Sequence, residues 1–422
     1  MFPLLLAAAA VLPPVPVFTR DIAPILYKHC SGCHHEGQVA PFPLLTYDDA
    51  RKRARLIADV TRARTMPPWQ AVAGYGHFAG ERRLTAAEIS AIQTWAAKGA
   101  PQGDPAKLPP QPVFNDDWQL GTPDVVVHPP ASMDVPADGP DLYECFAVPV
   151  SLPAERYIRA VEFRPGNRQV THHALLFLST SRAAHEPRYP CYGSTGLLPV
   201  QRLGVWSPGN EPIQMIDGAA LPLRPGTKLV AQVHYHPDGK PETDQWSLGL
   251  YFTDTPPVRR VVDIDVSTHL IDIPAGDAHY VLRSHFDIPI AVDVVGVIPH
   301  AHLLCREMRG WAVEPGGAKR WLLNIRDWNP DWQDQYRFVH PVRLPADSRI
   351  EMEFVYDNSA GNPRNPHSPP SRVRWGPGTD DEMGSLDVRS VPVHMEEMPE
   401  LSEAMWGAVM RSVGGRFYSP PR

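Results

Sequence analysis

Proline occupies 49 of the 422 positions of this chain, and this abundance constrains the fold more than any other feature. The fixed φ angle and the missing N–H of proline interrupt helices and central strands. We therefore expect short strands, many loops and few long helices. The length predicts two or three domains, because a single core rarely extends over so many residues.

Charge and hydropathy narrow the class of protein further. The formal net charge is −7, which argues against a nucleic-acid partner. Residues 1–16 are apolar but too short to cross a bilayer, and we interpret them as a secretory signal peptide, with a buried N-terminal segment as the alternative. The sequence contains no other long apolar run. We expect an exported protein, periplasmic or extracellular, without a membrane tether.

Helical signals are concentrated in residues 17–104. Thr19 is a candidate cap for a short helix that leads to Cys30, and Thr85 with Glu88 forms a capping box before a second helix. This stretch predicts a small all-α domain, followed by a proline-rich linker over residues 105–118.

The pattern changes after the linker. Short runs rich in β-branched and aromatic residues recur between Gly/Pro turns, which is typical of β-sandwiches. A joint at TDTPPVR divides this part into sandwich domains at 119–256 and 257–422. The expected fold is therefore an all-α domain followed by two all-β, jelly-roll-like sandwiches.

The sequence C-S-G-C-H at residues 30–34 has the form of a c-type haem attachment motif. Cys30 and Cys33 can form thioethers to the haem, and His34 can ligate the iron. A redox or zinc C-x-x-C is the alternative. Met66 is the best candidate for the sixth iron ligand and His77 is its rival, although a methionine is also an ordinary core residue.

Histidines occur in pairs in the β-rich part. Residues i and i+2 of a strand share a face, so such a pair can bind one metal, whereas adjacent histidines need a bulge or a strand end. Imidazole suits copper, zinc, nickel or iron. The pairs are His172 with His173, His234 with His236, and His300 with His302.

Sulfur-containing residues add two observations. Met383 offers a soft thioether that favours Cu(I), although a core methionine is the alternative. Cys145 and Cys191 could form a disulfide in an oxidising compartment, which leaves Cys305 as an odd thiol.

Four motifs in order resemble the copper type II, ascorbate-dependent monooxygenases, the family of peptidylglycine- and dopamine-hydroxylating enzymes. They are HHALLF at 172–177, VAQVHY at 230–235, HAH at 300–302 and DEM at 381–383, and the resemblance covers roughly residues 119–422. The N-terminal CSGCH and MPPW resemble bacterial fusions of a cytochrome c domain to this module.

The resemblance implies two β-sandwiches that each hold one copper ion and face each other across a cleft. A first, electron-relaying copper is implied at His172, His173 and His234, since the family motif Val-His-Tyr favours His234 over His236. The second copper, where oxygen binds and a C–H bond is broken, is implied at the catalytic set His300, His302 and Met383. Cys145 and Cys191 match a family disulfide.

Three positions depart from the peptide-amidating branch of the family. That branch has an Arg where this chain has Ile298, and an Asn and a Tyr where it has Ser385 and Asp387. Carboxylate binding needs positive or donor groups. We therefore expect glycine-extended peptides to be poor substrates. Gly384 stands where the animal enzymes have a disulfide cysteine.

Together these features predict a monooxygenase that uses O2 to hydroxylate a C–H bond of an unknown small molecule or peptide. Its cofactors are two copper ions and haem c. Electrons come through the fused haem, from ascorbate, or from a redox partner; the short linker keeps the haem at high effective concentration. The alternatives are a non-enzymatic copper/haem electron-transfer protein and a haem-tethered β-sandwich binding module.

Overall fold

The computed structural model describes residues 14–114, 118–181, 186–191, 195–197, 200–216, 218–376, 378 and 380–412. The signal peptide predicted at residues 1–16 lies almost entirely outside them. The expectation of few long helices is confirmed, because β-sandwich-like sheets make up most of the described chain and the longest described helix spans 15 residues. The strands are longer than expected, since several run nine or ten residues, as at Val292–Ala301 and Gly384–Pro392. No helix in these ranges is long and apolar enough to cross a membrane.

The chain forms two compact units. The described residues up to Trp69 join Arg82–Phe114 in the first unit, and Gln70–Glu81 joins the rest of the chain in the second. Residues 70–81 lie within the range 17–104 that the helical signals predict as the N-terminal domain. Two isolated β-bridges, from Ala71 to Ile325 and from Phe78 to Phe338, pair them with the second unit instead.

The described elements of the first unit are helical. Its core packs Phe18, Ile22, Leu26 and Trp95. The Thr85–Glu88 capping box is confirmed. The elements are the turn Phe18–Ile22, α1 (Ala23–His29), α2 (Tyr47–Lys52), α3 (Ala54–Arg62), α4 (Ala86–Ala97) and the turn Pro105–Lys107.

The predicted cap at Thr19 is wrong. The first helical turn begins at Phe18, its N-cap is Val17, and Val17 makes no side-chain capping bond. Thr19 is buried inside the turn. The apolar Phe18 must enter the core, so the helix starts two residues earlier than a polar cap at Thr19 would allow.

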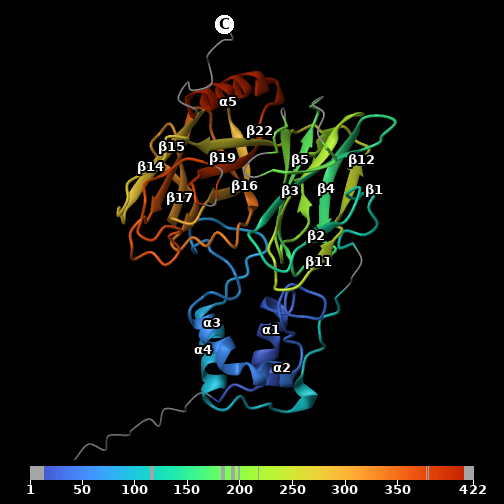
Figure 1. Ribbon diagram of the computed structural model, residues 1–422, viewed down its shortest axis with the longest axis vertical. Coiled ribbons are helices and arrows are strands. Elements are labelled where there is room, and N and C mark those ends of the chain that lie inside the picture. Colours follow the sequence, from blue (N-terminus) through green and yellow to red (C-terminus); the bar gives the residue numbers. More distant parts are fainter. Residues whose placement is uncertain are drawn as a thin grey trace, which may run out of the picture. The chain divides into compact units, whose positions relative to one another are not determined.

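The first half of the second unit contains two five-stranded antiparallel sheets and the short antiparallel pair β2-β11 (Figure 1). One sheet has the order β1-β12-β4-β8 with β9 on β4, and the other has the order β6-β3-β10-β5-β7. Their strands are β1 (Val125–Val127), β2 (Met133–Val135), β3 (Leu142–Pro149), β4 (Arg156–Arg164), β5 (Thr171–Ser179), β6 (Arg188–Pro190), β7 (Val200–Trp206), β8 (Ile213–Gln214), β9 (Leu221–Leu223), β10 (Lys228–Tyr235), β11 (Glu242–Asp244) and β12 (Ser247–Thr253).

The second half has two four-stranded antiparallel sheets, β13-β22-β16-β19 and β15-β20-β17-β18, and the pair β14-β21. The final helix α5 (Met398–Ser412) contacts β13 and β15 (Figure 1). The strands are β13 (Val262–Ser267), β14 (Asp272–Ile273), β15 (Tyr280–Ile288), β16 (Val292–Ala301), β17 (Cys305–Val313), β18 (Lys319–Ile325), β19 (Tyr336–Leu344), β20 (Ser348–Tyr356), β21 (Val373–Arg374) and β22 (Gly384–Pro392).

The two halves of the second unit share a core. Val295 of β16 and Val391 of β22 pack into the apolar cluster of the first half. This explains why β16 and β22 are buried along almost their whole length, on both faces. A strand covered on both faces loses the polar alternation of a half-exposed strand.

Charged side chains also cross between the halves. Arg202 of β7 forms an ion pair with Asp387 of β22, and Arg389 donates to the carbonyl oxygen of Leu203 while it pairs with Asp263. Buried charges of this kind need partners, because removing one member of a pair leaves the other as an uncompensated buried charge. The pairs therefore fix one half against the other at the strands that border the site described next.

Candidate metal centres

The first histidine cluster lies where β5 begins and β10 ends. His234 of β10 is the cross-strand partner of His173 on β5, and the register shifts between His234 and Tyr235. This irregularity and the end of the strand place the side chains of the adjacent His172 and His173 in one cluster, as expected for adjacent histidines that bind one metal. One nitrogen from each of His172, His173 and His234 lies within 4.8 Å of the others.

The three imidazoles of this cluster present their Nδ1 atoms to one another. Nδ1 of His173 lies 3.1 Å from Nδ1 of His172 and 3.4 Å from Nδ1 of His234. Burial, followed by the charge of His234, lowers the pKa of His172 to about 4, and burial lowers the pKa of His173 well below its usual value. These two rings are therefore neutral at pH 7, which is the form that binds metals.

Asp141 orients His234. Its Oδ2 lies 2.7 Å from Nε2 of His234, so Nε2–H donates to the carboxylate and Nδ1 keeps its lone pair for the cluster. The hydrogen bond from His234 is the largest effect that lowers the pKa of Asp141, to about 2. Tyr143 stacks on the other face of the ring, with centroids 4.3 Å apart.

His236 lies outside the cluster of three. Its Nδ1 is 2.7 Å from Oδ1 of Asp141, and its side chain is 66% exposed. The structure thus separates the two histidines between which the spacing alone could not choose.

The second cluster lies at the end of β16. His300 is the penultimate residue of the strand and His302 follows it, with ring centroids 5.3 Å apart. Nδ1 of His300 lies 2.7 Å from Oε1 of Gln333, and Nδ1 of His302 lies 3.1 Å from the carbonyl oxygen of Asp381. Both rings therefore donate from Nδ1 and keep Nε2 for a metal, the opposite of the first cluster. Met383 lines the same cavity.

A buried glutamate holds the second cluster together. Glu382 is fully buried, and its carboxyl group accepts the backbone N–H of His302 at 2.5 Å, of Met383 at 2.9 Å and of Leu304 at 2.9 Å. Burial raises the pKa of Glu382 to about 8, although the three N–H donors act in the opposite direction. Tyr356 fixes the same loop by donating to the carbonyl oxygen of Met383.

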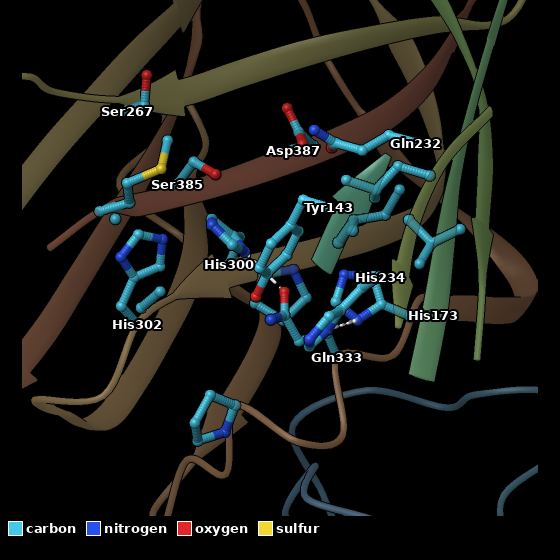
Figure 2. Close-up of a pocket in the computed structure, with 18 of the residues that line it drawn as sticks. Tyr143, His173, Gln232, His234, Ser267, His300, His302, Gln333, Ser385 and Asp387 are labelled. Atoms are coloured by element: carbon cyan, nitrogen blue, oxygen red, sulfur yellow. Dashed lines mark hydrogen bonds between the residues drawn. The ribbon is translucent and has the colours of Figure 1, made fainter. Parts of the chain in front are cut away.

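Both clusters line one cavity of about 340 Å³ (Figure 2). Figure 2 shows His173 and His234 on one side of it and His300 and His302 on the other. The same cavity is lined by the three positions at which the chain departs from the peptide-amidating branch, which are Ile298, Ser385 and Asp387.

Acidic side chains outnumber Arg and Lys among the described residues of the cavity wall. Among the described residues that line it, Arg202 is the single Arg or Lys, and Asp387 is its ion-pair partner. The lining carboxylates are Asp141, Asp265, Asp331 and Asp387. A substrate carboxylate would therefore meet no uncompensated positive side chain among them.

The C-x-x-C-H motif lies in the turn after α1. Burial raises the pKa of the Cys30 thiol to about 12, whereas a redox-active C-x-x-C needs a lowered thiol pKa. Nδ1 of His34 lies 3.0 Å from the carbonyl oxygen of Phe42, which leaves Nε2 for an axial bond. Met66 belongs to the same unit as this motif, whereas its rival His77 lies in the segment that belongs to the second unit.

The remaining cysteines behave as structural groups. The disulfide between Cys145 and Cys191 is confirmed. It connects β3 to the segment after β6 and is consistent with an oxidising compartment. Cys305 is a buried thiol, and burial raises its pKa well above the usual value, so it is not a reactive cysteine.

Comparisons with known proteins identify no family for this chain. No protein-family model matches it, and no curated protein matches it. PNGF-II shares 10% identity over 59% of this chain and 60% of its own, with a TM-score of 0.24. The infectious bursal disease virus Gt strain structure shares 12% identity over 66% and 74%, with a TM-score of 0.17. The chain thus spans less than two thirds of PNGF-II.

Proposed function

We propose that this chain is a copper-dependent monooxygenase of the copper type II, ascorbate-dependent family, fused to a c-type haem domain. The reaction converts a substrate C–H bond, O2, two electrons and two protons into C–OH and water. The observation that carries the proposal is the pair of imidazole clusters that line one cavity and present opposite ring nitrogens.

The residues fit copper at both places. The Nδ1 atoms of His172, His173 and His234 converge and can offer lone pairs to one ion, and a packed core would not bring three such acceptors together. His300, His302 and Met383 combine imidazole with a thioether, a set that suits copper in either oxidation state. Bound copper would supply the one-electron chemistry and the activation of O2.

The protein residues supply orientation. Asp141 keeps Nδ1 of His234 free, and Gln333 keeps Nε2 of His300 free. Glu382 fixes the backbone of His302 and Met383 together, so the second donor set is held before metal arrives. The wall between the clusters admits the substrate and discriminates against carboxylates.

Haem attached at Cys30 and Cys33, with His34 and Met66 as axial ligands, would supply electrons one at a time. The raised pKa of the Cys30 thiol argues against redox dithiol chemistry, and the orientation of the His34 ring fits an axial iron ligand. The covalent fusion places this donor at high local concentration, with free ascorbate as the alternative reductant.

The first experiment counts copper and haem iron in the full-length exported protein and in Met383→Ala. We expect one haem and two coppers per chain in the wild type, and a weakened second site in the variant. Incorporation of one atom of ¹⁸O2 into a product would then establish hydroxylation and exclude a protein that only transfers electrons. Purification without copper from copper-supplemented cells would refute the proposal and leave a binding module.

Rapid mixing tests the role of the haem. In Cys30→Ser with Cys33→Ser, which cannot attach haem, we expect slower reduction of the coppers by an external donor. Reduction at the wild-type rate would remove the haem from the electron route.

A further inference from the structure

The connection between β18 and β19 includes a loop, Trp328–Gln333, that contacts the second histidine cluster. Gln333 at its end accepts the Nδ1–H of His300 at 2.7 Å. At its beginning, the indole of Trp328 donates to the carbonyl oxygen of Ala301, between the two histidines. The position of this loop therefore decides whether Gln333 can reach His300.

The middle of the loop is held by a segment from another part of the chain. Gln70–Glu81 leaves the helical unit, crosses the second half of the β-rich unit and returns. Val72 N–H donates to Asn324 of β18, and Ala79 N–H donates to Arg337 of β19. Both β18 and β19 are edge strands, so the segment covers backbone groups that an open edge would expose.

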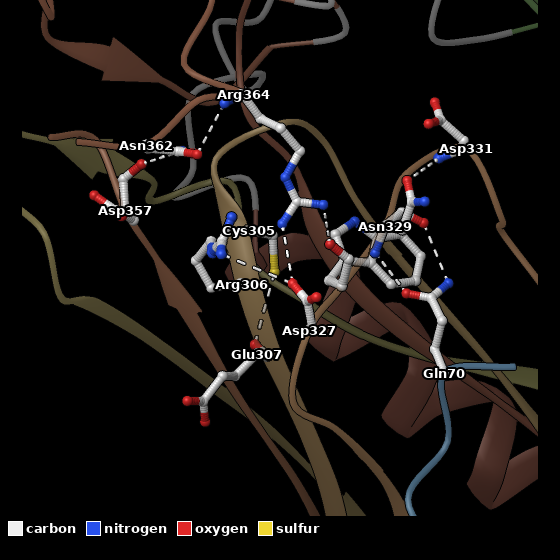
Figure 3. Close-up of polar contacts among 11 residues, drawn as sticks. Gln70, Cys305, Arg306, Glu307, Asp327, Asn329, Asp331, Asp357, Asn362 and Arg364 are labelled. Atoms are coloured by element: carbon white, nitrogen blue, oxygen red, sulfur yellow. Dashed lines mark hydrogen bonds and ion pairs between the residues drawn. The ribbon is translucent and has the colours of Figure 1, made fainter. Parts of the chain in front are cut away.

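Gln70 is the first residue of this segment, and both the oxygen and the nitrogen of its side-chain amide form hydrogen bonds with the loop (Figure 3). Its Oε1 accepts the N–H of Asn329 at 2.5 Å. Its Nε2 donates to the carbonyl oxygens of Asn329 at 3.2 Å and Trp332 at 2.6 Å. Only an uncharged amide of this length supplies a donor and an acceptor to such a pattern.

We propose that Gln70 is a positioning residue for the second metal site, because it holds the loop that places Gln333 against His300. The inference rests on the proposed function, which makes His300 a copper ligand. Partners that orient a metal-binding histidine change metal affinity about 10- to 100-fold when they are removed. Gln70 acts one step further out, through the backbone that carries such a partner.

The proposal has a structural consequence. Gln70 lies four residues after Met66, so the segment that carries the candidate haem ligand continues directly into the segment that positions a candidate copper ligand. Gln70, which would complete the second site, thus lies outside the range 257–422 that contains His300, His302 and Met383.

The test measures Cu(I) affinity by competition with a chromogenic chelator. All variants are made in full-length protein that also carries His172→Ala and His173→Ala, so that the second site is titrated alone. We expect Gln70→Ala to weaken Cu(I) binding about 10-fold, with faster hydrogen exchange at the Asn329 amide. Gln70→Glu keeps the acceptor but repels the two carbonyl oxygens, and we expect a similar loss.

Two further variants separate positioning from general loosening. Tyr75 packs edge-on against Trp321 in the middle of the same segment, and Tyr75→Ala should leave Cu(I) affinity unchanged. Gln333→Ala should weaken binding by itself. Adding Gln70→Ala to Gln333→Ala should then cost little more, because both act on one hydrogen bond to His300.

Each outcome decides the question. Unchanged affinity in Gln70→Ala, equal losses in Tyr75→Ala, or additive losses with Gln333→Ala would overturn the positioning role while the copper sites stand. Absence of Cu(I) at the second site of the protein with Gln70 intact would overturn the proposed function as well.

Discussion

Replacing Glu382 by glutamine tests how the second site is built. The change keeps the size and shape of a fully buried side chain that accepts three backbone N–H groups, and it converts one acceptor oxygen into an NH2 group. If the remaining oxygen takes the place that serves His302 and Met383, the N–H of Leu304 loses its acceptor.

The size of the effect follows from that one group. A buried donor without a partner costs about 1–3 kcal/mol, and part of this is offset because an acidic group no longer needs to be buried. We expect a net loss of about 1–2 kcal/mol. This corresponds to a fall in Tm of about 2–8 °C for a unit of this size, measured on the metal-free protein. Cu(I) affinity of the second site should fall about 10-fold, because both ligand backbones shift.

Glu162 provides a matched control. It is also a buried glutamate, 3% exposed, and it accepts backbone N–H groups from Gln119 at 2.9 Å and Leu120 at 3.3 Å, away from both histidine clusters. Glu162→Gln should lower Tm by a similar amount and leave copper binding intact. If Glu382→Gln behaves in the same way, with full Cu(I) affinity, then Glu382 stabilises the fold only and the reasoning fails.

Three further predictions concern the first site, the disulfide and the substrate. Burial lowers the pKa of His172 to about 4 and the pKa of His173 well below its usual value, so both rings should already be neutral at pH 6. Calorimetry in two buffers should therefore show that they release almost no protons on copper binding, whereas ordinary histidines would release about 0.75 each. The Cys145–Cys191 disulfide spans 46 residues, and Cys191→Ser should lower the unfolding free energy by about 4 kcal/mol in denaturant titrations. Glycine-extended peptides should give no amidated product by mass spectrometry, because Arg202 is already paired with Asp387, and a clean amidation assay would refute this.

The sequence predicts much of the second unit because its signals are local. Short apolar runs between turns mark the strands, and paired histidines such as His300 and His302 stand out within a few residues. The pairing of Cys145 with Cys191 followed from a resemblance and is now confirmed. The ligand sets themselves remain predictions until metal is measured.

The residues that the sequence could not predict act over long separations. Asp141 meets His234 across 93 residues, and Gln70 meets Asn329 across 259. The residues next to Asp141 and Gln70 in the sequence have no periodic pattern that would predict either contact. The sequence assigns segment 70–81 to the wrong unit for the same reason. Its backbone pairs with the open edges of β18 and β19, and no local pattern in the segment predicts those partners.

The two clusters also differ in a way that counting histidines cannot detect. An imidazole offers a metal whichever nitrogen it does not use as a donor, and the second partner makes that choice. Asp141 takes the Nε2–H of His234, so that ring offers Nδ1, whereas Gln333 and the backbone of Asp381 take Nδ1–H from His300 and His302. Because Nδ1 lies closer to the backbone than Nε2, an ion bound by the first set would lie nearer to its strands than an ion bound by the second set. The carboxylate and amide partners therefore specify the difference between the sites, and substitutions there alter one site without removing a ligand from either.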